Sequence, residues 1–291
     1  YNDCPRFLVN LGKGSVKYQD SCLRPSTNLT ELWEQGNGMN QPYGFATEAA
    51  KNPDIDEDLY LFGPPAEPVN VHDVGSPTVN ALLDSSGGNK GKEKWDFVVM
   101  NDHTQAPARL DSRKTTQTAL LEKYLPLVLE NQATLVIIET AAYQRPGINN
   151  SKDLGSAHEF QSRVREGIQS YLEVLQPKFP ESLQPRIAPV GTAYLHLHDN
   201  NNLLWNELFD PFDHFHPSPL GTFLQGCVVH CTLFGCAPPL PRTEEEIKAL
   251  WKDARVMHHV KTGKNRRLPS VKEAEELWNV AKRVCTRESS L

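Results

Sequence analysis

Short, uninterrupted apolar runs are the clearest feature of the hydrophobic pattern. The first covers 97–100 and stops abruptly at Asn101-Asp102-His103, and the second covers 134–138 and ends at Glu139-Thr140. Runs of this length without polar alternation are typical of strands buried on both faces of a parallel sheet. We predict a third short strand at 186–191 and, from the alternation of apolar and polar residues, a half-buried strand at 69–74.

Apolar residues at helical spacing separate these strands. The strongest such pattern predicts a helix over 157–175, and further helices are predicted after a cap at Ser112, over 192–197 and over 220–234. Strands that alternate with amphipathic helices indicate an α/β fold with a parallel sheet covered on both faces. Ligands in such sheets bind beyond the carboxyl ends of the strands, where Asn101 and Asp102 are expected.

The first part of the chain predicts a different set of elements. Asp3 and Pro5 are typical of a helix start, and Phe7, Leu8 and Leu11 give the following residues an apolar side, so we predict a helix that ends at Gly12. A short strand over 15–22, a brief helix over 30–35, a long surface segment over 40–68 and a mobile Gly/Lys/Ser-rich stretch over 85–94 are predicted to follow.

The C-terminal part has a separate character. Thr243–Glu246 and Ser270–Glu273 are both capping boxes, so we predict helices over 243–258 and 270–285, joined by a basic loop at 261–267. We therefore divide the chain into an α/β domain, 1–238, and a C-terminal helical extension, 239–291. The extension offers a surface for a protein partner.

Composition and charge exclude some classes of function. The chain has 291 residues, of which 38% are hydrophobic and 23% charged, as expected of a chain with a substantial core. The formal net charge is -6 and no long basic run occurs, which argues against nucleic acid as a partner. No apolar run approaches the length needed to span a bilayer, and no cofactor motif is found, so we predict neither a membrane span nor a cofactor.

Two short motifs bear on the compartment. Asn28-Leu29-Thr30 and Asn149-Asn150-Ser151 are N-glycosylation sequons, with Asn28 and Asn149 as the acceptors. The cysteines are even in number but form no CxxC pair, which argues against a zinc ribbon (residues 4, 22, 227, 231, 236 and 285). Sequons and cysteine count favour the secretory route or the extracellular space. Because the sequence begins at Tyr1, either a leader was removed or it starts inside a longer chain.

Candidate chemistry concentrates in the stretch from Phe209 to Pro219, which holds two acids, two histidines and three prolines. Asp213 and His216 stand three residues apart in a turn stiffened by proline. That arrangement suits a general base and the carboxylate that orients it. The alternative is a rigid turn that only begins the following helix.

These residues resemble the SGNH (GDSL-like) hydrolases. The resemblance rests on the strand that ends at Asn101-Asp102 and on Asp213-His214-Phe215-His216-Pro217. It implies a three-layer α/β/α sandwich with a mainly parallel, flavodoxin-like sheet. It also implies that Asp213 orients His216, that His216 is the general base, and that Asn101 helps to form the oxyanion hole. From their place on the same polar rim, Asp102, His103 and His214 are further candidates to line the pocket. The alternative for Asp102 and His103 is that they are solvated loop residues.

The serine that the family uses as nucleophile has no clear counterpart. In the family it follows the first, central strand in a G-D-S or G-N-S turn. Ser15, in Gly12-Lys13-Gly14-Ser15, is the nearest match, but the predicted helix before it and strand after it reverse the expected order. Ser26 is a weaker candidate. Tyr1–Arg6 resembles the segment that follows the family's serine, so we expect the first strand and its serine upstream of Tyr1, and unrecorded residues or another chain to fill the gap in the sheet.

Two functions follow from these residues. The first is a serine hydrolase that acts on carboxylic esters (an esterase, a lipase or a carbohydrate acetyl-esterase), with a small-molecule, glycan or lipid ester as substrate. The second is a catalytically inactive hydrolase-like module that serves as a structural or binding subunit. The histidine pairs at 196/198 and 214/216 raise the question of a metal, but without a third ligand pattern we predict no metal site.

Overall fold

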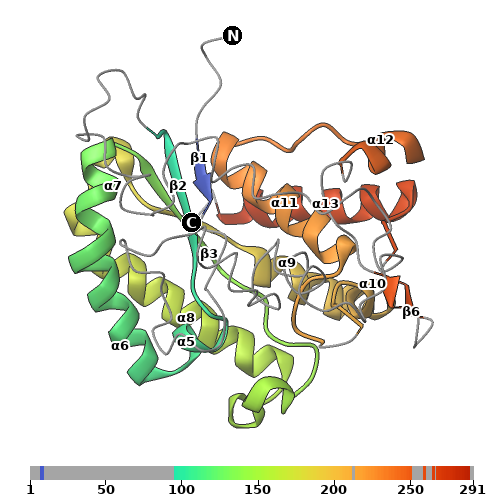
Figure 1. Cartoon of the computed structure of the whole chain (residues 1–291), viewed down its shortest axis with the longest axis horizontal. Helices are drawn as coiled ribbons and strands as arrows, with labels where there is room; N and C mark the ends of the chain where they lie inside the picture. The colour runs from blue at the N-terminus through green and yellow to red at the C-terminus, as the bar shows by residue number, and fades with distance from the viewer. Residues whose placement is uncertain are drawn as a thin grey trace, which may run out of the picture. The chain divides into compact units, whose positions relative to one another are not determined.

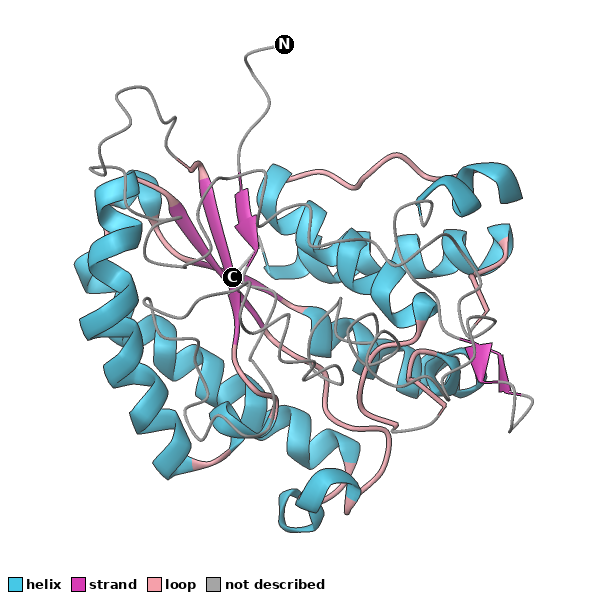
Figure 2. Ribbon diagram, in the orientation of Figure 1, coloured by secondary structure: helices cyan, strands magenta, loops and turns pink. Residues whose placement is uncertain are grey.

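A computed structural model describes residues 7–9, 95–211, 214–250, 258–259, 264–265 and 267–288 of the chain. These residues form an α/β fold in which helices predominate around a small sheet, as the cyan and magenta segments of Figure 2 show. The predicted α/β class is therefore confirmed. By their contacts the described residues fall into a first unit (7–9, 95–138 and 165–187) and a second unit (139–164 and 188–288 with the gaps above), and each is described by itself.

The sheet has four described strands in the order β1-β2-β3-β4. Strand β1 pairs in parallel with β2, and β2 pairs in parallel with β3, with Val99 opposite Val136 (Figure 1). The predicted runs at 97–100 and 134–138 both form strands, and their central residues Val98, Val99, Leu135 and Val136 are buried. The strand bounds are Phe7–Val9 (β1), Phe97–Asn101 (β2), Thr134–Ile138 (β3) and Arg186–Ala188 (β4).

The helix predicted to begin near Asp3 is wrong where the structure describes it. Residues Phe7–Val9 form strand β1, with Phe7 opposite Phe97 of β2. Three apolar residues in a row fit one turn of helix or one short strand equally well, and here pairing with a buried neighbouring strand decides between them. The sheet thus contains a strand near the start of the recorded sequence, beside β2.

The first unit contains several helical segments beside its strands. The helix predicted around 119–128 is present, although a single π-helical turn interrupts it and its buried residues include Leu120, Tyr124 and Val128. Ser112 does not cap it, because the helix already begins at Leu110 after Arg109. The segments are α5 (Gln105–Ala108), α6 (Leu110–Ala119), η2 (Leu120–Tyr124), α7 (Leu125–Asn131), η5 (Gln176–Lys178), η6 (Glu181–Leu183) and the second half of α8 (Ala157–Leu175).

The second unit holds the remaining helices. Helix α8 has the predicted bounds, α11 starts one residue before its predicted start, and α9 begins at Val190, two residues earlier than predicted. The predicted helix over 243–258 is wrong at its last residue, because His258 belongs to strand β5, which pairs antiparallel with β6. Strand β6 lies within the predicted basic loop. The segments are η3 (Ile148–Asn150), η4 (Lys152–Leu154), α9 (Val190–Asn200), α10 (Asn202–Glu207), α11 (Pro219–Phe234), α12 (Glu244–Leu250), β5 (His258–His259), β6 (Lys264–Asn265) and α13 (Val271–Glu288).

Helices α12 and α13 begin at the two predicted capping boxes. The Glu246 N–H donates to Thr243 Oγ1 (3.1 Å), and the Ser270 N–H donates to Glu273 Oε2 (2.8 Å). Helix α13 packs along α11 and also contacts α9, burying Leu277 and Ala281 (Figure 1). The division at residue 238 stays a prediction, but α13 belongs by its contacts to the same unit as α9 and α11.

Several predictions lie outside the described residues. They concern the strands at 15–22 and 69–74, the helix at 30–35, and the segments at 40–68 and 85–94. The candidate site residues Asp213, Ser15, Ser26 and Asn28 also lie outside them. None of the described helices has the length and apolar character required to cross a membrane.

Candidate active site

The end of strand β2 carries the first group of candidate residues. Asn101 is the last residue of the strand and is half-buried, and its side-chain amide lies 3.5 Å from the Asp102 carbonyl. His103 is also half-buried. Asn101 belongs to the first unit and His216 to the second, so their predicted shared site stays a prediction.

Asp102 is a buried carboxylate and not a solvated loop residue, since it is only 5% exposed. Its Oδ1 accepts the His103 N–H (2.7 Å). Its Oδ2 accepts the hydroxyls of Thr116 on α6 (2.7 Å) and Tyr171 on α8 (2.8 Å). Three donors compensate the loss of water around these two oxygens, and they fix the end of β2 to two helices of the same unit.

The turn that contains His216 lies in the second unit and is held by its own main chain. The Asp210 N–H donates to the His216 carbonyl (2.8 Å), and the His214 N–H donates to the Asp210 carbonyl (2.9 Å). Phe209 and Pro217 form an isolated antiparallel bridge, which closes the turn at its base. These main-chain contacts hold the backbone at His216.

A segment that follows strand β3 supports one side of this turn. The Gln144 N–H donates to the His214 carbonyl (3.1 Å), and Gln144 Oε1 lies 2.7 Å from His214 Nδ1. The rings of Tyr143 and Phe215 are 5.1 Å apart, and the Phe215 and His216 rings are 4.1 Å apart. His214 thus serves to attach the turn to Gln144, while half-buried His216 lies against an aromatic surface.

Helix α11 begins directly after the turn, and its first residues fix the turn from the other side. Ser218 Oγ accepts the Gly221 N–H (3.2 Å) and donates to the Glu207 carbonyl. Gly221 packs so closely that a Cβ there would collide with the Leu208 carbonyl and the Tyr194 hydroxyl. Burial raises the pKa of Tyr194, so its hydroxyl stays protonated, and it accepts a hydrogen bond from Gln225 (3.2 Å).

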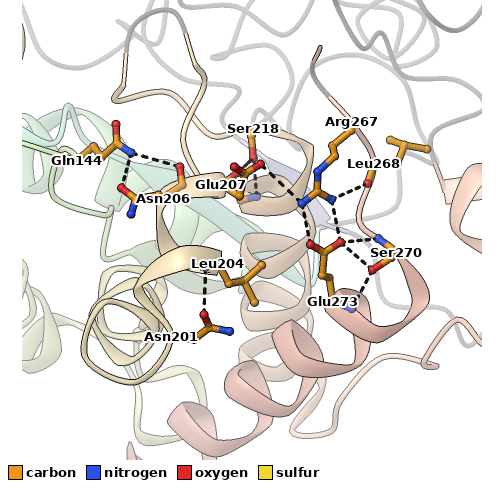
Figure 3. A network of polar contacts seen from close by, with 11 residues as sticks. Gln144, Asn201, Leu204, Asn206, Glu207, Ser218, Arg267, Leu268, Ser270 and Glu273 are labelled. Carbon is orange, nitrogen blue, oxygen red and sulfur yellow. Dashed lines mark hydrogen bonds and ion pairs between the residues drawn. The ribbon is translucent and has the colours of Figure 1, made fainter. Parts of the chain in front are cut away.

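A polar network connects the base of this turn to the start of α13, as Figure 3 shows. Arg267 binds both carboxylate oxygens of Glu273 (2.7 and 2.8 Å) and lies 3.6 Å from a Glu207 carboxylate oxygen. The Arg267 guanidinium, followed by the Ser270 bonds, lowers the pKa of Glu273 to about 2. Glu207 therefore joins the Ser218 hydroxyl on one side to the C-terminal helix on the other.

Glu139 is a structural acid that the sequence indicated only as the end of a strand. It is 2% exposed, and its Oε1 accepts the Gln161 side-chain amide (2.7 Å) and the Thr192 hydroxyl (3.1 Å). Its main chain donates to the Ala188 carbonyl and accepts from Gly191. These partners lie 22 to 53 positions away along the chain, so no local pattern could have revealed the cluster.

The remaining candidates are placed as follows. Asn149 is exposed in a 3-10 turn at a φ of 50°, and its glycosylation stays a prediction. Cys227 and Cys231 are buried thiols, and burial raises the pKa of Cys227 to about 12. His196 and His198 stand two apart on a helix and point different ways, so they do not converge: His198 contacts Asp199, and His196 lies near Asn200.

Comparison with known proteins completes the description. No protein-family model matches the chain, and no curated protein does. A candidate SGNH hydrolase from Slackia heliotrinireducens is 20% identical, covers 56% of this chain and 78% of its own, and has a TM-score of 0.37. A DUF4886 family protein from Bacteroides uniformis is 15% identical, covers 67% of this chain and 64% of its own, and has a TM-score of 0.44. At these scores the functional assignment rests on the residues of the chain itself.

Proposed function

We propose that this protein hydrolyses carboxylic esters by the SGNH type of acyl-enzyme mechanism, with His216 as the general base. The observation that carries the proposal is the turn at 214–217. Its main chain is closed by hydrogen bonds, and it presents a half-buried histidine directly before Pro217 and the start of α11. A general base must be held in one orientation near its substrate, which such a turn provides.

Ser15 is the nucleophile in this proposal. One part of the objection to Ser15 is the helix expected before it, and residues 7–9 form strand β1 instead. The strand expected at 15–22 lies outside the described residues. Ser15 follows Gly14, six positions beyond Val9 at the end of β1, so a strand precedes this serine as the SGNH resemblance requires. Asp213 would orient His216, and Asn101 would stabilise the oxyanion.

The reaction proceeds in two steps, formation of the acyl-enzyme and its hydrolysis. His216 takes the proton of the serine hydroxyl while the serine oxygen bonds to the ester carbonyl carbon. The tetrahedral intermediate collapses, and the alkoxide leaves with the proton held by His216. Water, deprotonated by His216, then attacks the acyl-enzyme; the released serine oxygen regains the proton, and the carboxylic acid departs.

Labelling with a fluorophosphonate tests the proposal, because the reagent phosphonylates a serine only where a base activates it. We expect one labelled serine in the wild-type protein, identified as Ser15 by peptide mass spectrometry, and no labelling in Ser15→Ala or His216→Ala. His230→Ala is the matched control, since His230 lies on α11 and binds the Cys236 carbonyl (3.0 Å).

Two results would change the assignment. Label on a different serine that still requires His216 would move the nucleophile and keep the hydrolase. A folded wild-type protein that is neither labelled nor active on aryl acetates would contradict hydrolysis and favour the alternative of a catalytically inactive binding module.

A further inference from the structure

Three side chains that carry metal-binding atoms meet on the surface of the second unit, within one group formed by α8 and α9. His158 lies in the first turn of α8, and His198 and Asp199 lie in the last turn of α9. Both His158 Nε2 and His198 Nδ1 are 2.8 Å from Asp199 Oδ1. One ligand atom from each residue lies within 4.8 Å of the other two.

The histidine side chains are held by aromatic neighbours. The His198 ring meets the Trp205 ring edge to face, with centroids 4.6 Å apart, and the His158 ring meets the His198 ring in the same manner at 4.9 Å. Trp205 is buried, whereas the side chains of His158 and Asp199 are each about half exposed. The group is thus partly fixed by the fold and open to ions from solvent.

We propose that His158, His198 and Asp199 bind one divalent transition-metal ion of the Zn²⁺ type. The two imidazoles are ligands of borderline softness that suit Zn²⁺, Ni²⁺ and Cu²⁺ and not Mg²⁺ or Ca²⁺. A carboxylate is a common further ligand of Zn²⁺ beside two histidines. Three protein ligands leave one tetrahedral position for water.

The observed distances can be compared with those of a zinc site. Ligand atoms at about 2.0 to 2.2 Å from Zn²⁺ lie roughly 3.3 to 3.6 Å from one another in a tetrahedron. The two 2.8 Å contacts to Asp199 would open by about 0.5 to 0.8 Å, and the two histidine nitrogens, which lie within 4.8 Å of one another, would take up the same separation by side-chain rotation. The alternative is that the two histidines and the aspartate form a hydrogen-bonded group that binds no ion.

Metal binding at this position would stabilise the start of α8, the end of α9 and the residues that follow α9. His198 contacts Trp205 on α10, and Trp205 contacts Phe209, which bridges to Pro217 at the base of the His216 turn. An ion that fixes His198 therefore stabilises a continuous set of contacts in the second unit. It does so whether or not the protein is a hydrolase.

Equilibrium dialysis and calorimetry with Zn²⁺ on the full chain, stripped of metal by a chelator, test the site. We expect one equivalent bound by the wild-type protein, and binding at least about tenfold weaker in His158→Ala and in Asp199→Asn, because loss of an outer partner alone weakens metal sites 10- to 100-fold. His196→Ala is the matched control: it removes a histidine from the same helix but outside the group and should bind as the wild type does.

A thermal melt with and without Zn²⁺ gives a second readout that does not rely on stoichiometry. The ion should raise the melting temperature of the wild type and of His196→Ala, but not that of His158→Ala. Co²⁺ in place of Zn²⁺ should give the visible absorption of a tetrahedral site. Equal binding by the wild type and His158→Ala, or no binding by the wild type, would overturn the proposal in favour of the hydrogen-bonded group.

Discussion

The acid at the end of β2 and the turn that carries His216 are both polar, but they are built in opposite ways. Asp102 is held by its side chain, whose two oxygens accept three hydrogen bonds from the main chain and from two helices. The His216 turn is held by its main chain, through hydrogen bonds at Asp210 and His214 and a bridge at its base.

This difference distinguishes a residue that stabilises the fold from a residue that is expected to take part in a reaction. Where a side chain supplies the bonds that hold the fold, its replacement leaves buried donors without partners and destabilises the protein. Where the main chain supplies them, the side chain can be exchanged without disturbing the backbone. We therefore expect substitutions at Asp102 to affect unfolding and substitutions at His216 to affect catalysis.

The largest expected effect is on activity. His216→Ala should lower kcat for aryl acetate hydrolysis by about 100- to 10,000-fold, the range supplied by a positioned general base. Its melting temperature should fall far less than that of Asp102→Ala, because main-chain hydrogen bonds and the bridge at its base hold the turn. A large fall in melting temperature would show that the imidazole is a structural group and would remove the contrast with Asp102.

Asp102→Ala should give the largest loss of stability. The hydroxyls of Thr116 and Tyr171 lose their acceptor inside the first unit, which we expect to lower the free energy of unfolding by about 3 kcal/mol. Urea denaturation measures this change. Asp111→Ala, which removes an exposed acid from α6, should change the same quantity by less than about 1 kcal/mol.

Gly221→Ala tests how tightly α11 packs behind the turn. The added methyl group collides with the Leu208 carbonyl and the Tyr194 hydroxyl, so we expect a loss of about 2 kcal/mol from overpacking. Gly226 lies on the same helix with open space at its Cβ position, and Gly226→Ala should instead stabilise the protein by about 0.5 to 1 kcal/mol. Opposite signs for the two variants in urea denaturation are the expected result.

The smallest effect concerns Glu273, whose pKa lies near 2 when folded against an ordinary value of 4.5. A lowered folded pKa contributes stability that is present above about pH 4.5 and is lost as the pH falls toward 2. Because the Arg267 guanidinium is partly exposed and screened, we expect Glu273→Gln to cost only about 1 kcal/mol at pH 7 and nothing near pH 2. Exposed Glu275 on the same helix is the control, since Glu275→Gln should leave the pH dependence unchanged.

The parts of the fold that were predictable from sequence are those with a strong local signal. Residues 134–138 and 157–175 have the bounds expected of a buried strand and an amphipathic helix, because an apolar run and a helical period are each complete within those segments. The capping boxes at Thr243 and Ser270 likewise need only four residues. The strand at residues 7–9 was not predictable from a local signal. Three apolar residues show no period, and the pairing with β2 joins residues that are far apart in the sequence.

The candidate site residues, like the elements of the fold, were predictable only where the signal is local in the sequence. His216 was identifiable as a candidate because the residues that form its turn are consecutive in the sequence. The partners of Asp102 and Glu139 come from helices 14 to 69 positions away, and the metal-binding group combines residues 41 positions apart. Their hydrogen bonds are a product of the tertiary fold, which a single sequence does not display.

The packing of α13 against α11 and α9 has a consequence for the order in which the protein is made. During synthesis α9, α11 and the His216 turn leave the ribosome well before α13, so the surfaces that Leu277 and Ala281 later cover stay open. Arg267, which joins the turn region to Glu273, is also absent until then. The second unit is thus completed after the first, and a nascent chain that stalls before α13 presents an incomplete unit to chaperones and proteases.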